Sequence, residues 1–258
     1  MEIQLTSAPC AAGQVLPLAA GAVRGMAAHC TQLPVPQLPV GTELCYNGEV
    51  LFLVTGRAVL PASQSPHALF CPLLQAVQPC TGGAFSLQSQ RRGRALAWVT
   101  LSDKGSQGLR EDSSGPAIET MVRKIMPLAH AQGFLLPDDA AQLSCLLYEL
   151  AGQGYDCICT TGGTGLGARD VSPQATARVL EYSLPGFVQA MMQASLSKTP
   201  HAALSRALAG VLGKSIIINL PGSHKAVVEN LAAVLPALPH ALDKLQGDTT
   251  DCAVAYKG

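Results

Sequence analysis

The 258-residue sequence lacks three features, each of which would point to a class of protein. It has no net charge, because 17 basic residues balance 17 acidic ones, and no segment gathers the basic excess typical of a nucleic-acid binder. It has no unbroken apolar run of about 18 residues, the length that suggests a membrane span. No Lys or Arg precedes the mildly apolar residues 11–23, as a secretory signal would require. We therefore expect a soluble protein that binds neither nucleic acid nor a membrane.

The nine cysteines lack the pattern of a disulfide framework. Their number is odd, their spacing is irregular, and the chain is too long for a small stapled scaffold. We expect free thiols in a reducing compartment, which favours a cytoplasmic protein. Cys157 and Cys159 point the same way on a predicted strand, and we expect them to be buried core thiols rather than metal ligands.

Charged residues are scarce in the first third of the chain. Residues 1–90 hold five of the 34 charged residues, but nine of the 18 prolines and five of the nine cysteines. Such a stretch without helical periodicity predicts β-structure and loops, and it is too apolar for ordinary disorder. We therefore expect a smaller β-rich module at residues 1–92 and a second domain at residues 93–258.

The segment Thr42–Thr55 predicts a β-hairpin. Apolar residues alternate on both sides of Asn47-Gly48, a dipeptide that supplies the positive φ angles of a tight turn. Together with residues 38–42, this short segment resembles part of the MOSC (molybdenum cofactor sulfurase C-terminal) domain. The alternative is a small β-module used for packing or oligomer contacts, and we assign no functional residue here.

From residue 95 onward, apolar runs of strand length alternate with helical stripes. The strands are expected near residues 95–101, 135–136, 156–161 and 215–219, and the helices near residues 118–129, 143–150 and 227–235. This alternation predicts an α/β domain with a mostly parallel sheet and helices on both faces. In such folds ligands bind beyond the carboxyl ends of the strands, where the glycine-bearing loops 162–167 and 221–223 begin.

The loop that starts with Gly162-Gly163-Thr164-Gly165 is the most informative segment. Clustered glycines let backbone N–H groups approach an anion, and a helix beginning near Pro173, capped by Ser172, would add its positive end. The loop is not a Walker A motif, because Ala168-Arg169 stands where that motif has Lys-Ser/Thr. The dinucleotide fingerprint also fails, since no helix opens directly after the glycines. On glycine content alone, a phosphate site and a plain tight turn remain equal alternatives.

Two aspartates favour the phosphate site. Asp170 ends the glycine loop, and Asp138 follows the strand predicted at residues 135–136. In a parallel sheet both would lie at the same edge, where they could hold the Mg²⁺ that nucleotidyl transfer between anionic partners requires. The alternative for each is a helix-capping role, for Asp170 near Ser172 and for Asp138 before the helix around residues 140–150.

Six ordered motifs between residues 95 and 250 resemble the MogA/MoaB family of molybdopterin-binding proteins, including the G domain of gephyrin. They are Ser102-Asp103-Lys104-Gly105-Ser106 with Glu111-Asp112-Ser113-Ser114-Gly115-Pro116, then Leu136-Pro137-Asp138, the segment from Thr160 through Pro173, Leu184-Pro185-Gly186-Phe187 with Met191-Met192-Gln193, Leu204-Ser205-Arg206, and Asn219-Leu220-Pro221-Gly222-Ser223. Their number and order make this resemblance far more specific than a lone glycine loop. Residues 1–90 lie outside it.

The resemblance implies a three-layer α/β domain, usually trimeric, that acts late in molybdenum cofactor synthesis. Family members transfer AMP from ATP to the terminal phosphate of molybdopterin and release pyrophosphate, which prepares the pterin for handover to a molybdate-insertion protein. ATP and molybdopterin are then the substrates and Mg²⁺ the cofactor. The residues that match the family's catalytic acids and would hold the metal ion are Asp138 and Asp170.

The same resemblance assigns the other site residues. The nucleotide side would be lined by Ser102 and Asp103, and nucleotide phosphates would meet the N–H groups of Gly162, Gly163, Thr164 and Gly165. The pterin side would be lined by Ser205, Arg206, Pro221, Gly222 and Ser223. A structural ion pair is the alternative for Arg206 and for Arg169. The chain has Ser223-His224 where relatives often have Asn or Gln followed by Pro, so the pterin-side contacts are the least defined.

Two other functions stay open. One is a catalytically silent, trimeric molybdopterin carrier or scaffold, and the other is a related nucleotide hydrolase of the competence-damage type, which shares the fold. The presence of Asp138 and Asp170 favours the adenylyltransferase over the carrier. Rapid ATP breakdown without any pterin would favour the hydrolase.

Overall fold

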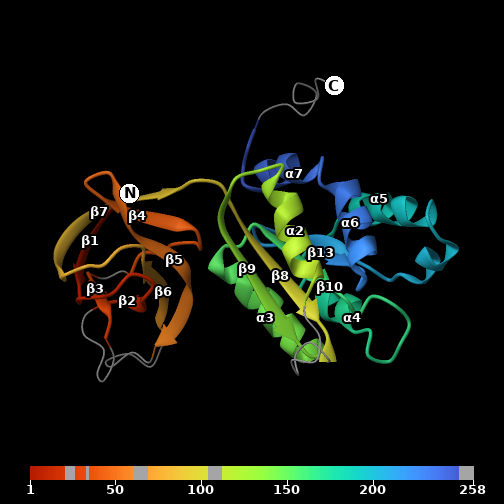
Figure 1. Ribbon diagram of the computed structural model, residues 1–258, viewed down its shortest axis with the longest axis horizontal. Coiled ribbons are helices and arrows are strands. Elements are labelled where there is room, and N and C mark those ends of the chain that lie inside the picture. Colours follow the sequence, from red (N-terminus) through yellow and green to blue (C-terminus); the bar gives the residue numbers. More distant parts are fainter. Residues whose placement is uncertain (21–26, 33–34, 61–68, 104–111, 250–258) are drawn as a thin grey trace. The chain divides into compact units, whose positions relative to one another are not determined.

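The computed structural model describes residues 1–20, 27–32, 35–60, 69–103 and 112–249. The chain divides into two compact units, of which the first comprises Met1–Ala95 with Leu128–His130 and the second Leu96–Pro127 with Ala131–Gly258. Figure 1 shows that the first unit is built from strands, whereas the second combines strands and helices. Among the described residues, no helix combines the length and the apolar composition that a membrane crossing requires.

The first unit is a closed barrel with the strand order β1-β3-β2-β6-β5-β4-β7. Its strands are β1 (Glu2–Ser7), β2 (Val15–Ala19), β3 (His29–Thr31), β4 (Thr42–Tyr46), β5 (Glu49–Leu60), β6 (Leu69–Ala76) and β7 (Gly83–Arg91). Closure leaves no open sheet edge, and alternate side chains fill the interior. The largest of these core residues are Leu18, Leu44, Phe52, Leu74 and Leu87. The expected β-rich N-terminal region is confirmed.

The hairpin predicted at Thr42–Thr55 is present. Strands β4 and β5 pair antiparallel, and the turn between them is Asn47-Gly48, with φ angles of 49° and 86°. Two positive φ angles in a two-residue turn match the twist of the flanking strands. Hairpins of this kind occur in many barrels, so the resemblance to a MOSC domain stays a prediction.

His29 is an unusual member of the barrel core. Its side chain is fully buried, its ring lies 4.6 Å from the ring of Phe52, and neither ring nitrogen has a hydrogen-bond partner among the described residues. Burial disfavours the charged imidazolium, which lowers the pKa of His29 from 6.5 to about 4.

We expect the barrel to lose stability as the pH falls from about 6.5 to about 4. In this window the unfolded chain binds a proton at His29 and the folded chain does not, so acidification favours unfolding by on the order of 2–3 kcal/mol. The measurement is the free energy of opening of barrel peptides from hydrogen exchange, corrected for intrinsic rates. The variant His29→Leu should lose most of this pH dependence, whereas His224→Gln, an exposed histidine of the second unit, should keep it. An unchanged dependence in His29→Leu would contradict the assignment.

The second unit carries a six-stranded sheet with the strand order β11-β12-β13-β10-β8-β9. The strands are β8 (Arg94–Leu101), β9 (Leu128–Leu136), β10 (Cys157–Thr161), β11 (Tyr182–Ser183), β12 (Ala209–Leu212) and β13 (Ser215–Leu220). β10 pairs in parallel with both β8 and β13, and every residue of β10 and β13 is buried. β12 pairs antiparallel with β13, and β11 antiparallel with β12. The α/β prediction is therefore confirmed, with the parallel strands at the centre of the sheet.

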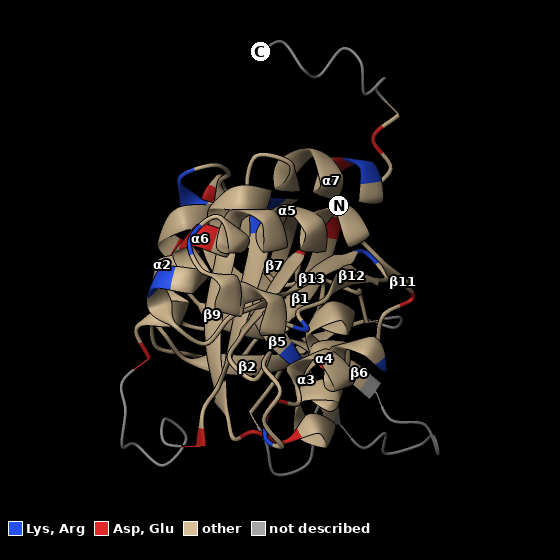
Figure 2. Ribbon diagram, turned by 90° about the vertical axis from the view of Figure 1, so that its right-hand side faces the viewer, with Lys and Arg blue, Asp and Glu red and all other residues tan. Residues whose placement is uncertain are grey.

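Helices cover both faces of this sheet. They are α2 (Ser114–Arg123), α3 (Ala140–Gln153), α4 (Ser172–Ala177), α5 (Pro185–Leu196), the 3₁₀ helix η1 (Pro200–Leu204), α6 (His224–Val234) and α7 (Leu238–Leu245). α2 packs on α6 and α3 packs on α4, and both pairs contact the central strands. Figure 2 shows α2 and α6 on one side of the strands and α3 and α4 on the other. The unit therefore has three layers.

Two local predictions were wrong. The helix expected near residues 118–129 ends at Arg123, and residues 128–136 form β9. Pro127 explains this difference, because proline has no N–H to continue a helix and restricts the residue before it. Ser172 is not the N-cap of the following helix but its first residue, and the N-cap is Val171.

Candidate functional site

The two glycine-bearing loops lie against each other at the carboxyl ends of β10 and β13. Gly162 donates its N–H to the carbonyl of Leu220 at 3.2 Å, and the hydroxyl of Thr161 donates to the carbonyl of Pro221 at 2.7 Å. A Cβ atom on Gly222 would lie 3.3 Å from the Cα atom of Gly162. The structure thus brings the loops at residues 162–167 and 221–223 together at the predicted sheet edge.

The first loop presents a row of backbone donors. Gly162 and Gly163 have φ angles of 96° and 62°, which only glycine adopts without strain. Ser172 fixes this turn, because its hydroxyl donates to the carbonyl of Gly162 at 2.6 Å and its N–H donates to that of Gly163 at 3.0 Å. No described residue accepts a hydrogen bond from the N–H groups of Gly163, Thr164 or Gly165. Successive N–H groups of this kind form an anion-binding nest.

Asp170 folds back onto this loop. Its Oδ2 atom accepts a hydrogen bond from the N–H of Gly167 at 2.7 Å, and a Cβ atom on Gly165 or Gly167 would come within 2.9 Å of the same oxygen. The capping alternative does not hold, because the N-cap of α4 is Val171 and no side chain caps that helix. Both glycines are needed for the close approach of the Asp170 carboxylate.

Asp138 is not a helix cap either. The cap of α3 is Asp139, whose Oδ1 atom accepts from the N–H groups of Ala141 and Gln142 at 2.8 and 2.9 Å. Asp138 follows the end of β9 and is partly exposed. Partial burial raises the pKa of its carboxyl group above 3.8, and the negative charges of Asp103 and Asp170 raise it further, against the opposing effect of Arg169.

Asp103 and Arg169 complete a charged cluster around Asp138. Asp103 accepts a hydrogen bond from the N–H of Asp138 at 3.0 Å and forms an ion pair with Arg169 at 2.6 Å. The hydrogen bond from Asp138 lowers the pKa of Asp103, and the contact with Arg169 lowers it further. Arg169 thus forms the structural ion pair that was the alternative to a ligand contact. The carboxylates that follow β8, β9 and the glycine loop therefore influence one another electrostatically at one edge of the sheet.

Arg206 supports the glycine loop from the other side. Its Nε atom donates to the carbonyl of Gly165 at 2.6 Å, and its Nη2 atom donates to the backbone carbonyl of Asp170 at 2.7 Å. Its backbone N–H also donates to the carbonyl of Thr164 at 2.9 Å. These contacts direct the guanidinium group toward the loop backbone, so the structure shows it holding the loop in shape.

A cavity of about 270 Å³ lies beside the loop, between α5, η1 and α6. Four residues predicted at the site line it, namely Thr164, Gly165, Ser205 and Pro221. Ser223 caps α6, because its hydroxyl accepts a hydrogen bond from the N–H of Ala226 at 3.3 Å, and its place on the pterin side stays a prediction. A smaller hollow of about 60 Å³ brings together Ser102, Gly162 and Gly222. Asp170 and Arg206 line a shallow depression of about 380 Å³.

Sequence reasoning missed the part that Asp112 plays. Its Oδ1 atom accepts from the N–H groups of Ser114 and Gly115, both at 3.0 Å, and its Oδ2 atom accepts from the hydroxyl of Thr100 at 2.7 Å. It therefore joins the start of α2 to β8 beside the smaller hollow. The serines and proline that follow it are typical of a helix start and could have suggested this role. The neighbouring motif residues Lys104, Gly105, Ser106 and Glu111 lie outside the described residues.

Comparison with known sequences finds relatives of the second unit. A family model described as a probable molybdopterin binding domain matches residues 97–240. A molybdopterin adenylyltransferase of Helicobacter pylori is 39% identical over 154 residues, which cover 58% of this chain and 86% of that protein. Gephyrin of Dictyostelium discoideum is 39% identical over 153 residues, which cover 56% of this chain but 21% of gephyrin.

Solved structures with the same fold agree. The molybdopterin biosynthesis enzyme MoaB of Thermus thermophilus is 42% identical, with a TM-score of 0.55 over 60% of this chain and 98% of that one. A MogA structure is 33% identical, with a TM-score of 0.57 over 59% of this chain and 99% of that one. These likenesses cover little more than half of the chain, and the family match begins after the barrel.

Proposed function

Because this chain belongs to the family of probable molybdopterin binding domains, we propose that it transfers AMP from ATP to the terminal phosphate of molybdopterin and releases pyrophosphate. The relatives named molybdopterin adenylyltransferase support a role in molybdenum cofactor synthesis. The observation that carries the proposed chemistry is the row of N–H groups at Gly163–Gly165, without acceptors among the described residues, beside the carboxylate of Asp170, whose charge also acts on Asp138.

The reaction joins two anions, so the site must neutralise negative charge. We assign the N–H groups of Gly163–Gly165 to phosphate oxygens, which they can bind without a side chain in the way. The attacking phosphate oxygen is already ionised and needs no strong base. It forms a bond to the α-phosphorus of ATP, while the bond from that phosphorus to the bridging oxygen breaks and pyrophosphate leaves.

The acidic cluster suits a Mg²⁺ ion. Partial burial and the negative charges of Asp103 and Asp170 raise the pKa of Asp138, and a bound cation would offset both effects. The described residues hold no group of three His, Cys, Asp or Glu side chains placed to bind a metal ion. Mg²⁺ commonly takes only one or two protein carboxylates and completes its shell with phosphates and water. Asp138 and Asp170 would hold the ion, which would neutralise phosphate charge when bound.

The remaining assignments divide the site in two. Ser102 and Asp103 lie on the proposed nucleotide side, with the hollow of about 60 Å³. The cavity of about 270 Å³, with Ser205 and Pro221, takes the pterin side. Arg206 acts as a positioning residue through the loop carbonyls.

We further propose a cytoplasmic homotrimer that hands its product to a molybdate-insertion protein, and light scattering tests the trimer directly. The domain at residues 93–258 would carry the chemistry.

The test is pyrophosphate release by the full chain supplied with ATP, Mg²⁺ and molybdopterin. The proposal predicts release that depends on both ATP and molybdopterin. ATP breakdown at the same rate without the pterin would support the nucleotide hydrolase instead. Tight molybdopterin binding without any pyrophosphate release would support the carrier.

A further inference from the structure

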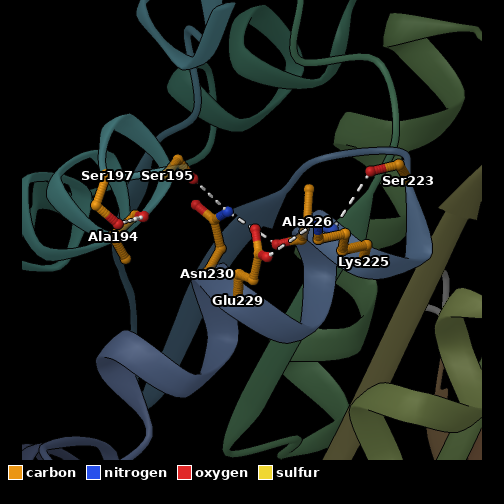
Figure 3. Close-up of polar contacts among 8 residues, drawn as sticks. All are labelled: Ala194, Ser195, Ser197, Ser223, Lys225, Ala226, Glu229 and Asn230. Carbon is orange, nitrogen blue, oxygen red and sulfur yellow. Dashed lines mark hydrogen bonds and ion pairs between the residues drawn. The ribbon is translucent and has the colours of Figure 1, made fainter. Parts of the chain in front are cut away.

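The glycine loop and two polar side chains on α6 line the same cavity of about 270 Å³. It is lined by Thr164 and Gly165 at the loop and by Glu229 and Asn230 on α6. The rest of the lining is largely apolar and comes from α5, α6, η1 and the loops that adjoin them. The apolar lining residues are Val188, Met191, Met192, Ala202, Leu204, Ala207, Pro221 and Ala226. Figure 3 shows Glu229 and Asn230 on neighbouring positions of α6, with Asn230 reaching Ser195.

Asn230 is held in one orientation. Asn230 is only 5% exposed. Its Nδ2 atom donates to the hydroxyl of Ser195 at 2.7 Å and to the carbonyl of Ala226 at 2.8 Å. Both N–H groups of the amide are thereby used. No described residue donates to its Oδ1 atom, so Asn230 can offer a ligand only an acceptor.

Glu229 offers acceptors as well. It forms an ion pair with Lys225, one turn earlier on α6, with 3.9 Å between the Nζ and Oε1 atoms. The Lys225 side chain is 83% exposed and that of Glu229 24% exposed, so this ion pair is long, open to water and weak. The carboxylate keeps its capacity to accept two hydrogen bonds side by side.

A ligand that binds Glu229 and Asn230 in this cavity needs paired N–H donors on a flat edge and a body that suits apolar walls. The 2-amino-4-oxopyrimidine ring of a pterin has this edge, because its 2-amino group and its N3–H lie next to each other. Two parallel N–H groups match the two oxygens of a carboxylate, as they do in the pairing of arginine with acidic side chains.

We propose that Glu229 is a specificity-determining residue that binds the 2-amino and N3–H groups of the pterin, with Asn230 Oδ1 accepting the second hydrogen of the 2-amino group. This inference rests on the proposed function and places the pterin head between α5 and α6. Thr164 and Gly165 line the same cavity, so the phosphate end of the substrate would lie toward the nest.

The test compares pterin with lumazine, which has an oxygen at C2 in place of the amino group. That oxygen would face the Glu229 carboxylate without a hydrogen between them, so the full chain should bind pterin roughly 10- to 100-fold more tightly than lumazine. Fluorescence titration gives both dissociation constants. In Glu229→Gln the amide can donate to the C2 oxygen, so pterin binding should weaken, lumazine binding should strengthen, and the ratio should approach one.

Two further variants separate recognition from general damage. Lys225→Gln removes the ion-pair partner but leaves the carboxylate, and it should keep the preference for pterin. Glu229→Asp keeps the charge on a shorter side chain and should bind both ligands less tightly with the preference retained. An unchanged ratio in Glu229→Gln would overturn the inference, and so would a lost preference in both Lys225→Gln and Glu229→Asp.

The same experiment distinguishes this inference from the proposed function. If the chain transfers AMP to molybdopterin but its preference for pterin over lumazine is unchanged in Glu229→Gln, only the proposed pterin contact is overturned. A preference for pterin that depends on Glu229, in a chain that transfers no AMP, would overturn the proposed reaction and support the contact.

Discussion

Replacing Asp170 with Asn should lower the rate of AMP transfer to molybdopterin by at least about 100-fold while leaving pterin affinity little changed. The substitution keeps the shape of the side chain, and its amide oxygen can still accept the hydrogen bond from Gly167. Arg206 contacts the backbone carbonyl of Asp170, which the substitution leaves in place. The loop should therefore keep its conformation and lose only the negative charge that would hold Mg²⁺. Pyrophosphate release and a pterin fluorescence titration measure the two quantities.

The matched control for this variant is Asp139→Asn. It removes an equal charge close to the acidic cluster, at a residue whose function is to cap α3. Asn caps a helix about as well as Asp, so both activity and stability should stay close to those of the unchanged chain. Full AMP transfer by Asp170→Asn, or an equal loss in Asp139→Asn, would contradict the role assigned to Asp170.

Replacing Asp138 with Asn should have two opposite effects, a loss of AMP transfer of at least about 100-fold and a small gain in stability. The pKa of Asp138 is higher in the folded chain than its usual 3.8. The folded state therefore binds this proton more readily than the unfolded state, and stability falls as the pH rises from 3.8 through the raised pKa. At neutral pH the ionised carboxylate opposes folding, and Asn removes that charge. We expect the Tm of the α/β unit to rise by roughly 1–3 °C without ligands.

Mg²⁺ gives this prediction a second readout. A cation that binds the folded state raises its Tm by mass action, so Mg²⁺ with ATP should stabilise the unchanged chain more than Asp138→Asn. Differential scanning calorimetry on both proteins, with and without Mg²⁺ and ATP, measures the two shifts. If ligand-free Asp138→Asn has a lower Tm than the unchanged chain, the ionised Asp138 carboxylate does not oppose folding. If Mg²⁺ with ATP raises the Tm of both proteins equally, Asp138 is not a metal ligand.

Local sequence patterns were enough to predict much of the fold. The hairpin at Asn47-Gly48 depends on two adjacent residues that tolerate positive φ angles, and β13 is a short apolar run, so both are visible in the sequence. The end of α2 was predicted wrongly because apolar residues continue at helical spacing beyond it. Pro127 was the local signal that the pattern of apolar residues concealed.

The site depends on contacts that no short pattern contains. Which of the adjacent residues Asp138 and Asp139 caps α3 depends on where the helix begins, and a shift of one residue exchanges their roles. Ser172 reaches back ten residues to the carbonyl of Gly162, and Asn230 reaches Ser195 across 35 residues. These contacts arise when α4 packs beside the loop and α6 beside α5. The cavity wall could therefore not be predicted from spacing alone.

Transfer of label from ATP to molybdopterin tests the central claim most directly. ATP labelled at the α-phosphate would be incubated with Mg²⁺, molybdopterin and the full chain, and the labelled products would be separated. We predict that the label moves to the pterin as its AMP derivative and that ATP labelled at the γ-phosphate yields labelled pyrophosphate. Label that appears only in free AMP or ADP, at a rate independent of molybdopterin, would contradict the account.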